Sequence, residues 1–197
     1  MATEPKTLYF GYGSNLWLRQ MRLRCPTSEY LGVARLRGYR WIINGRGYAN
    51  VVESQADNET ANSADVVYGL VYSLLPTDEA RLDVNEGVPE AYTKETMAVD
   101  FWASDPSVDD GQVDVSKPPQ DKEALVYIDR KRVTEDKPKK EYIYRMNMGI
   151  RDALDMGVPK KYVDGVMREF IPEEEEEKAG ETKAVAMKQA LNFVDEN

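Results

Sequence analysis

The chain has 197 residues, 42% of them hydrophobic, which suits a single domain with a substantial core. Its formal net charge of −9 and its pI of about 4.8 argue against nucleic acid as a partner, because phosphate contacts need a basic face. The chain contains no histidine, so any acid–base chemistry must come from Glu, Asp, Lys or Tyr. Its one cysteine, Cys25, has no partner for an intramolecular disulfide, and we interpret it as structural.

Other classes of ligand are disfavoured by what the sequence lacks. No stretch approaches the roughly 18 apolar residues of a membrane span, so no membrane partner is expected. Residues 1–5 do not resemble a secretory signal, and a cytoplasmic protein is the simplest hypothesis. A transition-metal site is not expected without histidine, and no glycine-rich nucleotide loop followed by lysine is present, so no cofactor is predicted. The sequence leaves both a monomer and a homodimer open.

The predicted elements begin with strands and continue with helices. The expected strands are rich in Val, Tyr, Trp and Ile: residues 7–12, one or two within 30–43, then 66–74, 93–102 and 124–129. The polar segments 53–65 and 103–121 are predicted loops. The expected helices are residues 16–24 (capped by Ser14 or Asn15), 77–86 (capped by Thr77 and ended by Gly87), 139–156 and 160–170. This order predicts an α+β fold with a mostly β, twisted or closed core and helices outside.

The end of the chain differs in composition from the rest. Residues 173–197 hold eight acidic residues against three lysines, and so carry a net charge of −5. They begin with a run of five glutamates and continue as a weakly amphipathic segment with Val185, Leu191 and Phe193. Most acidic runs are solvated. We therefore predict a single domain over residues 1–172 and an acidic tail over 173–197.

Two short motifs carry the chemistry. Gly11, Gly13, Ser14 and Asn15 follow the first strand, where a turn into a helix leaves backbone N–H groups that hold an anion or an oxyanion. A turn of this composition also exists for geometry alone. Ser14 is not expected to be a nucleophile, because no histidine can activate it.

The second motif is Glu86 at the end of the predicted helix 77–86. The negative end of the helix dipole and the poorly solvating neighbours Gly87, Val88 and Ala91 both favour a raised pKa for this carboxyl group. A carboxyl group with a pKa near neutrality both takes and returns a proton. The alternative is an exposed glutamate that simply ends a helix. Twelve tyrosines are also available to line a pocket and donate hydrogen bonds.

Taken together, these stretches resemble the γ-glutamylcyclotransferase family over roughly residues 7–170. The resemblance rests on Tyr12-Gly13-Ser14-Asn15-Leu16, on Glu86-Gly87-Val88, and on Tyr142 followed by Met146-Asn147-Met148-Gly149-Ile150. Asn15 resembles the branch that acts on γ-glutamyl amino acids, whereas the glutathione-specific branch usually has Gly-Ser-Leu there. The resemblance implies a small mixed β-barrel with surrounding helices, and no cofactor or metal.

The resemblance also implies a mechanism. Glu86 would take a proton from the α-ammonium of a γ-glutamyl amide, the freed amine would attack its own γ-carbonyl, and Glu86 would protonate the departing nitrogen, giving 5-oxoproline and a free amine. Ring closure within one molecule gains from proximity. Substrate contacts would come from residues of the first motif and from tyrosines: Tyr12, Gly13, Ser14, Asn15, Leu16, Tyr92, Tyr127 and Tyr142.

Two alternatives remain open from the sequence. The same chemistry would strip a γ-glutamyl group from a natural-product intermediate or a glutathione adduct, and a larger or more apolar pocket opposite Glu86 would favour that. A noncatalytic binding protein on the same fold is the other alternative, and the presence of Glu86 counts against it. The whole mechanism depends on whether Glu86 faces the Gly13–Asn15 turn.

Overall fold

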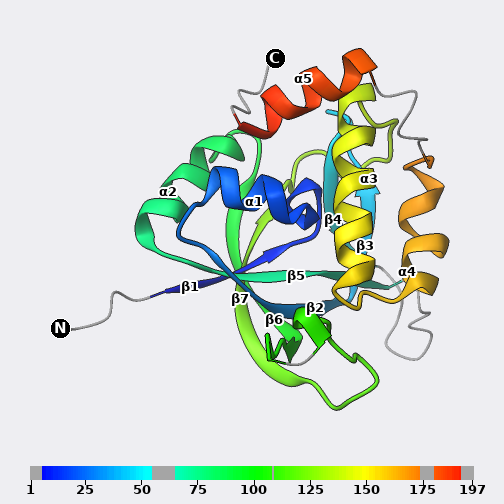
Figure 1. Ribbon diagram of the computed structural model, residues 1–197. Coiled ribbons are helices and arrows are strands. Elements are labelled where there is room, and N and C mark those ends of the chain that lie inside the picture. Colours follow the sequence, from blue (N-terminus) through cyan, green and yellow to red (C-terminus); the bar gives the residue numbers. More distant parts are fainter. Residues whose placement is uncertain (1–5, 55–64, 108, 174–179, 192–197) are drawn as a thin grey trace.

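A closed five-stranded barrel forms the centre of the computed structural model, which describes residues 6–54, 65–107, 109–173 and 180–191 (Figure 1). The strand order is β1 (Thr7–Gly11), β5 (Val66–Leu74), β2 (Glu29–Arg37), β6 (Thr93–Ala103) and β7 (Gln120–Ile128). β1 is antiparallel to β5 and closes the barrel by pairing in parallel with β7. With helices outside this mixed barrel, the predicted α+β fold class is confirmed.

The apolar side chains of the strands fill the barrel. Phe10, Val33, Leu70, Val126 and Ile128 are all inaccessible to solvent. The register of β2 against β5 shifts between Tyr30 and Gly32, where Gly32 has a φ of 149° and packs against the Trp102 carbonyl. Such a bulge increases the local twist that closing a small barrel requires.

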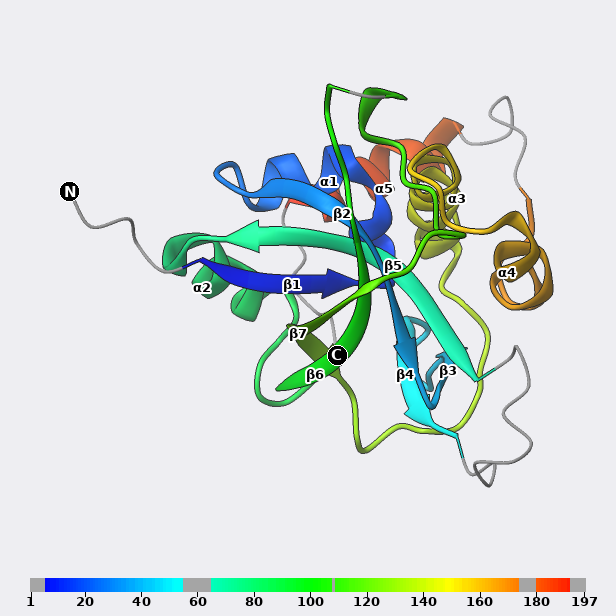
Figure 2. The ribbon, with the colours of Figure 1, turned by 90° about the horizontal axis from the view of Figure 1, so that it is seen from below.

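A separate hairpin of β3 (Tyr39–Ile43) and β4 (Ala49–Glu53) lies beside the barrel, as Figure 2 shows. The sequence predicted one or two strands within 30–43, which are β2 and β3, but it did not predict β4. The hairpin is tied to the barrel by buried polar contacts. Trp41 Nε1 donates to the Tyr12 carbonyl (2.9 Å), and Asn50 exchanges hydrogen bonds with the backbone of Asp129 (2.9 and 3.0 Å).

The helices, with η1 and η3, cover one end and one side of the barrel (Figure 1), whereas the 3₁₀ turn η2 lies in the loop between β6 and β7. Their bounds are η1 (Ser14–Leu16), α1 (Leu18–Arg24), α2 (Pro76–Asn85), η2 (Asp109–Gly111), α3 (Lys140–Asp155), α4 (Lys160–Gly165), η3 (Met167–Glu169) and α5 (Gly180–Leu191). α3 buries an apolar face that includes Met146, Ile150 and Ala153. Gly149 lets this helix approach η1, since a Cβ there would lie 3.0 Å from the Leu16 Cβ.

Several predicted helix ends need correction. α2 begins at Pro76 after Leu75, so Thr77 lies in the first turn and is not the N-cap. Neither Ser14 nor Asn15 caps α1; the N–H of Leu18 instead donates to Asp152 Oδ2 of α3 (2.8 Å). A side chain from the far end of the sequence has taken the role expected of a local one.

The remaining boundaries agree more closely with the sequence. α2 ends at Asn85 with Glu86 as its C-cap, and Gly87 follows in the left-handed region (φ 62°), as predicted. The helix expected over 160–170 is interrupted at Val166 into α4 and η3. The loop predicted at 103–121 holds turns and η2, and β7 begins before it ends. Most of the loop predicted at 53–65 lies outside the described residues.

The C-terminal segment contributes a helix that packs on the rest of the molecule. Ala186 and Ala190 of α5 are fully buried against Trp17 and Tyr144. Most of the glutamate run and Phe193 lie outside the described residues, and the division of the chain at residue 172 stays a prediction. Within the described part, no helix combines the length and the apolar character that crossing a membrane would require.

Candidate active site

A narrow cavity of about 40 Å³ lies where β1, η1, α1, β4, α2 and α3 meet. Its wall includes most of the residues that the sequence singled out: Tyr12, Gly13, Ser14, Asn15, Glu86, Tyr92, Tyr127 and Tyr142. The sequence analysis did not place the others there: Tyr9, Arg24, Tyr48, Ala49 and Arg145. Leu16 is absent from the wall; it is 1% exposed and its Cβ packs next to Gly149.

Glu86 faces the turn after β1. Its Oε1 accepts a hydrogen bond from Asn15 Nδ2 (3.0 Å), and its side chain is only 18% exposed. Burial raises the pKa of Glu86, and the opposing effects of Arg24 and of the hydrogen bond from Asn15 do not cancel it. The geometric condition on which the sequence-based mechanism depends is therefore met.

Asn15 is held by bonds to both ends of its amide. Besides Glu86, its Nδ2 donates to the Tyr9 hydroxyl (2.8 Å), while its Oδ1 accepts from Gln20 Nε2 (2.8 Å) and Arg24 Nη1 (3.1 Å). Its backbone carbonyl accepts from the Tyr72 hydroxyl (2.8 Å). With two donors and one acceptor satisfied in fixed directions, the amide keeps one orientation and presents an N–H to the Glu86 carboxylate.

Two buried arginines stand behind this turn. Arg24 Nη1 lies 3.9 Å from Glu86 Oε1, and Arg145 Nη1 donates to Ser14 Oγ (3.2 Å). Arg145 also pairs with Glu141 of its own helix through Nε (3.0 Å). Neither arginine was predicted as a site residue. The only hint in the sequence is helical spacing: Arg24 follows Gln20 and Met21 by four and three residues in α1, and Arg145 follows Tyr142 by three residues in α3, so each shares a helix face with buried residues.

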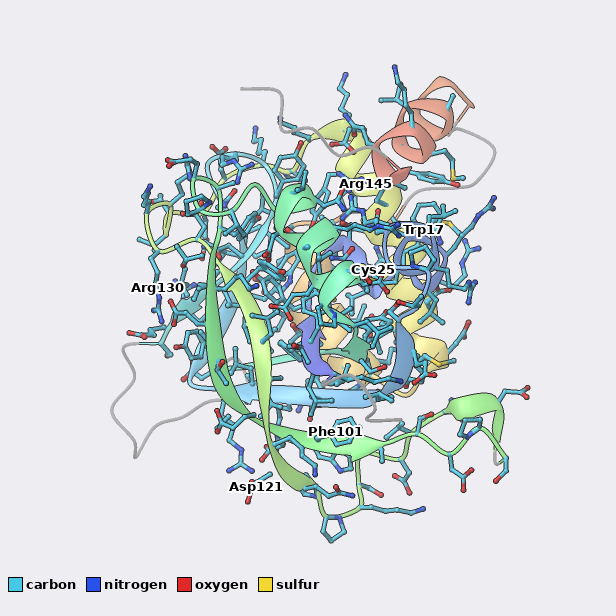
Figure 3. The ribbon with its side chains drawn as sticks, turned by 90° about the vertical axis from the view of Figure 1, so that its left-hand side faces the viewer. Trp17, Cys25, Phe101, Asp121, Arg130 and Arg145 are labelled. Carbon is cyan, nitrogen blue, oxygen red and sulfur yellow. The ribbon has the colours of Figure 1, made fainter. Side chains whose placement is uncertain are left out.

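Figure 3 shows where one of these arginines, Arg145, lies in the molecule. Arg145 lies close to α3 and α5, near Trp17, whereas Phe101 and Asp121 of the barrel strands lie at the opposite end. Cys25 lies near the end of α1. Its thiol is inaccessible, and burial raises its pKa to about 12. These properties support the structural interpretation of this cysteine.

The hydroxyl group of Tyr142 is oriented by two backbone groups. Its oxygen accepts from the N–H of Ser14 (3.1 Å) and from the N–H of Ala49 (3.3 Å). Gly13 makes this approach possible, because a Cβ there would lie 2.8 Å from the Tyr142 oxygen. Burial raises the pKa of Tyr142 to about 12, so the hydroxyl keeps its proton at neutral pH.

Three other tyrosines use their hydroxyl groups to fix the walls. Tyr12 donates to the Tyr127 carbonyl (2.6 Å), Tyr92 to the Ala49 carbonyl (2.8 Å), and Tyr127 to Asp83 Oδ1 (2.6 Å). Their rings contribute shape and a low dielectric around Glu86. Among the described residues, no three side chains of His, Cys, Asp or Glu gather as ligands for a metal ion.

Comparison with known proteins places this site in a family context. The model of the family described as "Gamma-glutamyl cyclotransferase, AIG2-like" matches residues 9–146. The chain is 31% identical over 91 residues to a gamma-glutamylcyclotransferase of Bos taurus, covering 41% of this chain and 44% of that protein. It is 30% identical over 95 residues to the Homo sapiens gamma-glutamylcyclotransferase, covering 43% and 46%. These alignments span less than half the length of either curated relative.

The similarity in fold extends further along the chain. A solved structure of a gamma-glutamyl cyclotransferase superposes with a TM-score of 0.66 over 93% of this chain and 99% of its own, at 21% identity. At that level of identity, the superposition shows a shared fold.

Proposed function

This chain belongs to the AIG2-like gamma-glutamyl cyclotransferase family, and from that premise we propose that it is a γ-glutamylcyclotransferase converting γ-glutamyl amino acids into 5-oxoproline and the free amino acid. The observation that carries the proposal is the contact between Glu86 Oε1 and Asn15 Nδ2 inside a small, tyrosine-walled cavity. This contact supports the proposal because it brings one carboxyl group of raised pKa to the wall of the cavity, beside the turn proposed to bind the substrate.

Glu86 serves as the proton carrier in the proposed reaction. Its carboxylate takes a proton from the α-ammonium group, and the neutral amine attacks the γ-carbonyl carbon to form the five-membered ring. The bond from that carbon to the amide nitrogen then breaks as Glu86 returns its proton to the departing nitrogen. After ring closure the ring nitrogen gives up a second proton, which Glu86 passes in the same way to the released amine. The α-nitrogen thus loses two protons and the departing nitrogen gains two, so Glu86 ends as the carboxylate with which it began.

Tyr142 is suited to stabilise the oxyanion of the tetrahedral intermediate. Its oxygen already accepts from Ser14 and Ala49, so its own proton is available to a third group. Those two N–H donors also make the hydroxyl a stronger donor. The N–H of Ser14 thus acts through Tyr142, while the N–H groups of Gly13 and Asn15 remain our proposed contacts for the substrate α-carboxylate.

The dimensions of the cavity favour a small group inside it. The cavity has a volume of only about 40 Å³, so in our proposal the glutamyl end enters it and the departing amine lies outside. The guanidinium carbon of Arg46 lies 5.6 Å from the ring centre of Tyr48 and 5.5 Å from that of Tyr92, and both rings line the wall. A cation at this place would attract the carboxylate that a departing amino acid carries. A larger or more apolar pocket would favour a natural-product intermediate or a glutathione adduct, so the small volume of this cavity supports the choice of γ-glutamyl amino acids. A cytoplasmic location and a monomeric or homodimeric state stay predictions.

The test is a comparison of the wild type with Glu86→Gln and Glu90→Gln. Glu90 is a matched control because it lies four residues further on with a side chain that is 89% exposed. Each protein is incubated with γ-glutamyl amino acids, glutathione and glutathione S-conjugates, and 5-oxoproline is measured by mass spectrometry. We expect product from the wild type and Glu90→Gln only, and more from γ-glutamyl amino acids than from the conjugates. Equal product from Glu86→Gln would exclude the mechanism.

A further inference from the structure

The last turn of α5 is hydrogen-bonded to Arg24, an arginine in the wall of the cavity. Arg24 Nε donates to the carbonyl of Ala190 (3.1 Å), and Arg24 Nη2 donates to that of Gln189 (3.3 Å). The last four carbonyls of a helix lack partners within the helix, and the negative end of its dipole attracts a cation. Arg24 therefore supplies the C-terminal cap of α5, although it lies more than 160 residues earlier in the chain.

The same guanidinium group reaches the site with its remaining nitrogen. Arg24 Nη1 donates to Asn15 Oδ1 and lies 3.9 Å from Glu86 Oε1. One planar group thus connects the end of α5 to both residues of the proposed proton-transfer contact. Because a guanidinium is a rigid fork, holding two of its nitrogens fixes the third.

A second connection runs from α5 to the other buried arginine. With its amide nitrogen turned toward α3, Gln189 donates to both carboxylate oxygens of Glu141 (2.6 and 2.9 Å). Glu141 pairs with Arg145, which donates to Ser14 Oγ. Two neighbouring residues of α5 therefore reach the turn after β1 indirectly. Ala190 does so through Arg24, which binds Asn15, and Gln189 through Glu141 and Arg145, which binds Ser14.

The packing of α5 sets how closely it approaches. Ala186 and Ala190 are both 0% exposed and lie against Trp17 and Tyr144. A larger side chain at either position would push the helix outward and draw its final carbonyls away from Arg24. Figure 1 shows α5 running across α1 and α3 at the end of the molecule where the site lies.

We propose that α5 is a positioning element of the active site, which holds Arg24 so that its charge lies beside Glu86 and its Nη1 orients Asn15. Arg24 is a positioning residue in this scheme, and α5 acts through it. The role assigned to Glu86 rests on the proposed function, but the physical link between α5 and this carboxyl group does not.

The link predicts a change in the titration of Glu86 when α5 moves. Charged and titratable groups from several elements surround this carboxyl group: Arg24 (α1), Arg46 (the β3–β4 turn), Arg145 (α3), and Tyr9, Tyr12, Tyr92, Tyr127, Tyr142 and Cys25. Arg24 is the first among those that lower the pKa of Glu86, followed by the hydrogen bond from Asn15. Moving Arg24 away weakens both effects, so the pKa rises.

The test compares Ala190→Leu with Ala184→Leu in the full chain. The substitution is the same and the helix is the same, but Ala184 is exposed and Ala190 is buried. For Ala190→Leu we expect the acidic limb of the pH profile of kcat/KM to shift to higher pH by roughly one pH unit, which is the effect of losing one close opposite charge. The loss of activity would be about tenfold below that limb and small above it. Ala184→Leu should match the wild type at every pH.

A double-mutant cycle separates this link from a general loss of stability. Arg24→Lys keeps the charge, but an ammonium group cannot span α5 and Asn15 as the guanidinium fork does. In the Arg24→Lys background, Ala190→Leu should therefore cause little further change in the pH profile. Additive effects of the two substitutions, or a loss from Ala190→Leu that is equal at all pH values, would overturn the proposal.

A third measurement does not need the enzyme to be active. The carboxyl stretch of Glu86, identified by difference from Glu86→Gln in infrared spectra, is titrated in the wild type, Ala190→Leu and Ala184→Leu. A higher pKa in Ala190→Leu alone supports the link; equal values in all three contradict it. If no substrate yields 5-oxoproline, the proposed function fails, while this titration still decides the role of α5.

Discussion

Asp100 and Glu86 both lie beside arginines, yet their pKa values move in opposite directions. Asp100 of β6 accepts from Arg35 Nε (2.8 Å), Arg37 Nε (2.6 Å) and Arg37 Nη2 (2.7 Å) on the adjacent strand β2. Burial favours a higher pKa for Asp100, but these hydrogen bonds outweigh it and the pKa is lowered. Glu86 has Arg24 only at 3.9 Å, and burial raises its pKa.

Side-chain exposure alone does not explain the difference, because Asp100 is 6% exposed and Glu86 is 18% exposed. The two carboxyl groups differ in the side chains that shield them from solvent. The two guanidinium groups themselves cover Asp100, and that of Arg37 remains in contact with water. Tyrosine rings and an amide surround Glu86, while the N–H groups of Arg24 are directed to Asn15 and to α5. A carboxyl group next to a cation stays able to bind a proton when the cation is bonded elsewhere.

The largest expected effect comes from neutralising each carboxyl group in turn. Glu86→Gln should lower kcat/KM by roughly 10²–10⁴, the usual contribution of a general acid–base. Asp100→Asn should leave kcat/KM unchanged but lower the free energy of unfolding by roughly 1–3 kcal/mol, because charged hydrogen bonds to two arginines are lost. Steady-state kinetics and urea unfolding measure the two effects. An Asp100→Asn enzyme as impaired as Glu86→Gln would show that the two regions are not separate.

Removing the hydroxyl group of Tyr142 is the next largest change. Tyr142→Phe should lower kcat by roughly 10²-fold with little change in KM, as the loss of an oxyanion donor does. Tyr144→Phe is the matched control, since Tyr144 lies on the same helix and packs against Trp17 at the α5 side. The prediction would be wrong if both variants had the same kcat.

The parts of this site that the sequence predicted are those encoded within a few neighbouring residues. Gly13-Ser14-Asn15 follows a strand, and Glu86-Gly87 ends a helix, so each motif is recognisable by itself. Arg24 was not predicted because its partners come from residues 15, 86, 189 and 190, which only the fold brings together.

The fold was predictable to a similar extent and for the same reason. Long apolar strands such as Val66–Leu74 are evident from composition, and the α+β barrel class was confirmed. The short strand Ala49–Glu53 was missed, because its position depends on Asn50 bonding to Asp129, far along the chain. Similarly, Thr77 has the composition of a helix cap, but Pro76 already begins the helix.

The dependence of stability on pH should have opposite signs at the two carboxyl groups. Glu86 has a folded pKa above its unfolded value. At a pH between these two pKa values the folded state holds a proton that the unfolded state has released, so stability falls as pH rises through that interval. Asp100 has a lowered folded pKa, so its contribution is complete above the unfolded pKa and is lost as pH falls toward the folded one. Urea unfolding across the acidic range, with Glu86→Gln and Asp100→Asn as references, measures each contribution as a difference. Two differences of the same sign would contradict the contrast.

The smallest effect tests the turns next to these groups. Gly87 follows Glu86 with a φ of 62°, and Gly38 follows Arg37 with a φ of 76°. Alanine at either position should cost about 1 kcal/mol of unfolding free energy, because a side chain disfavours the left-handed region. At Gly38 a Cβ would meet nothing within 4 Å, whereas at Gly87 it would lie 2.9 Å from the Ala91 Cβ. Gly87→Ala should therefore be the more destabilising and should also lower kcat, since the turn that orients Glu86 must shift, while Gly38→Ala keeps full activity. Equal kcat in the two variants would mean that the catalytic carboxyl group tolerates displacement of the turn that follows it.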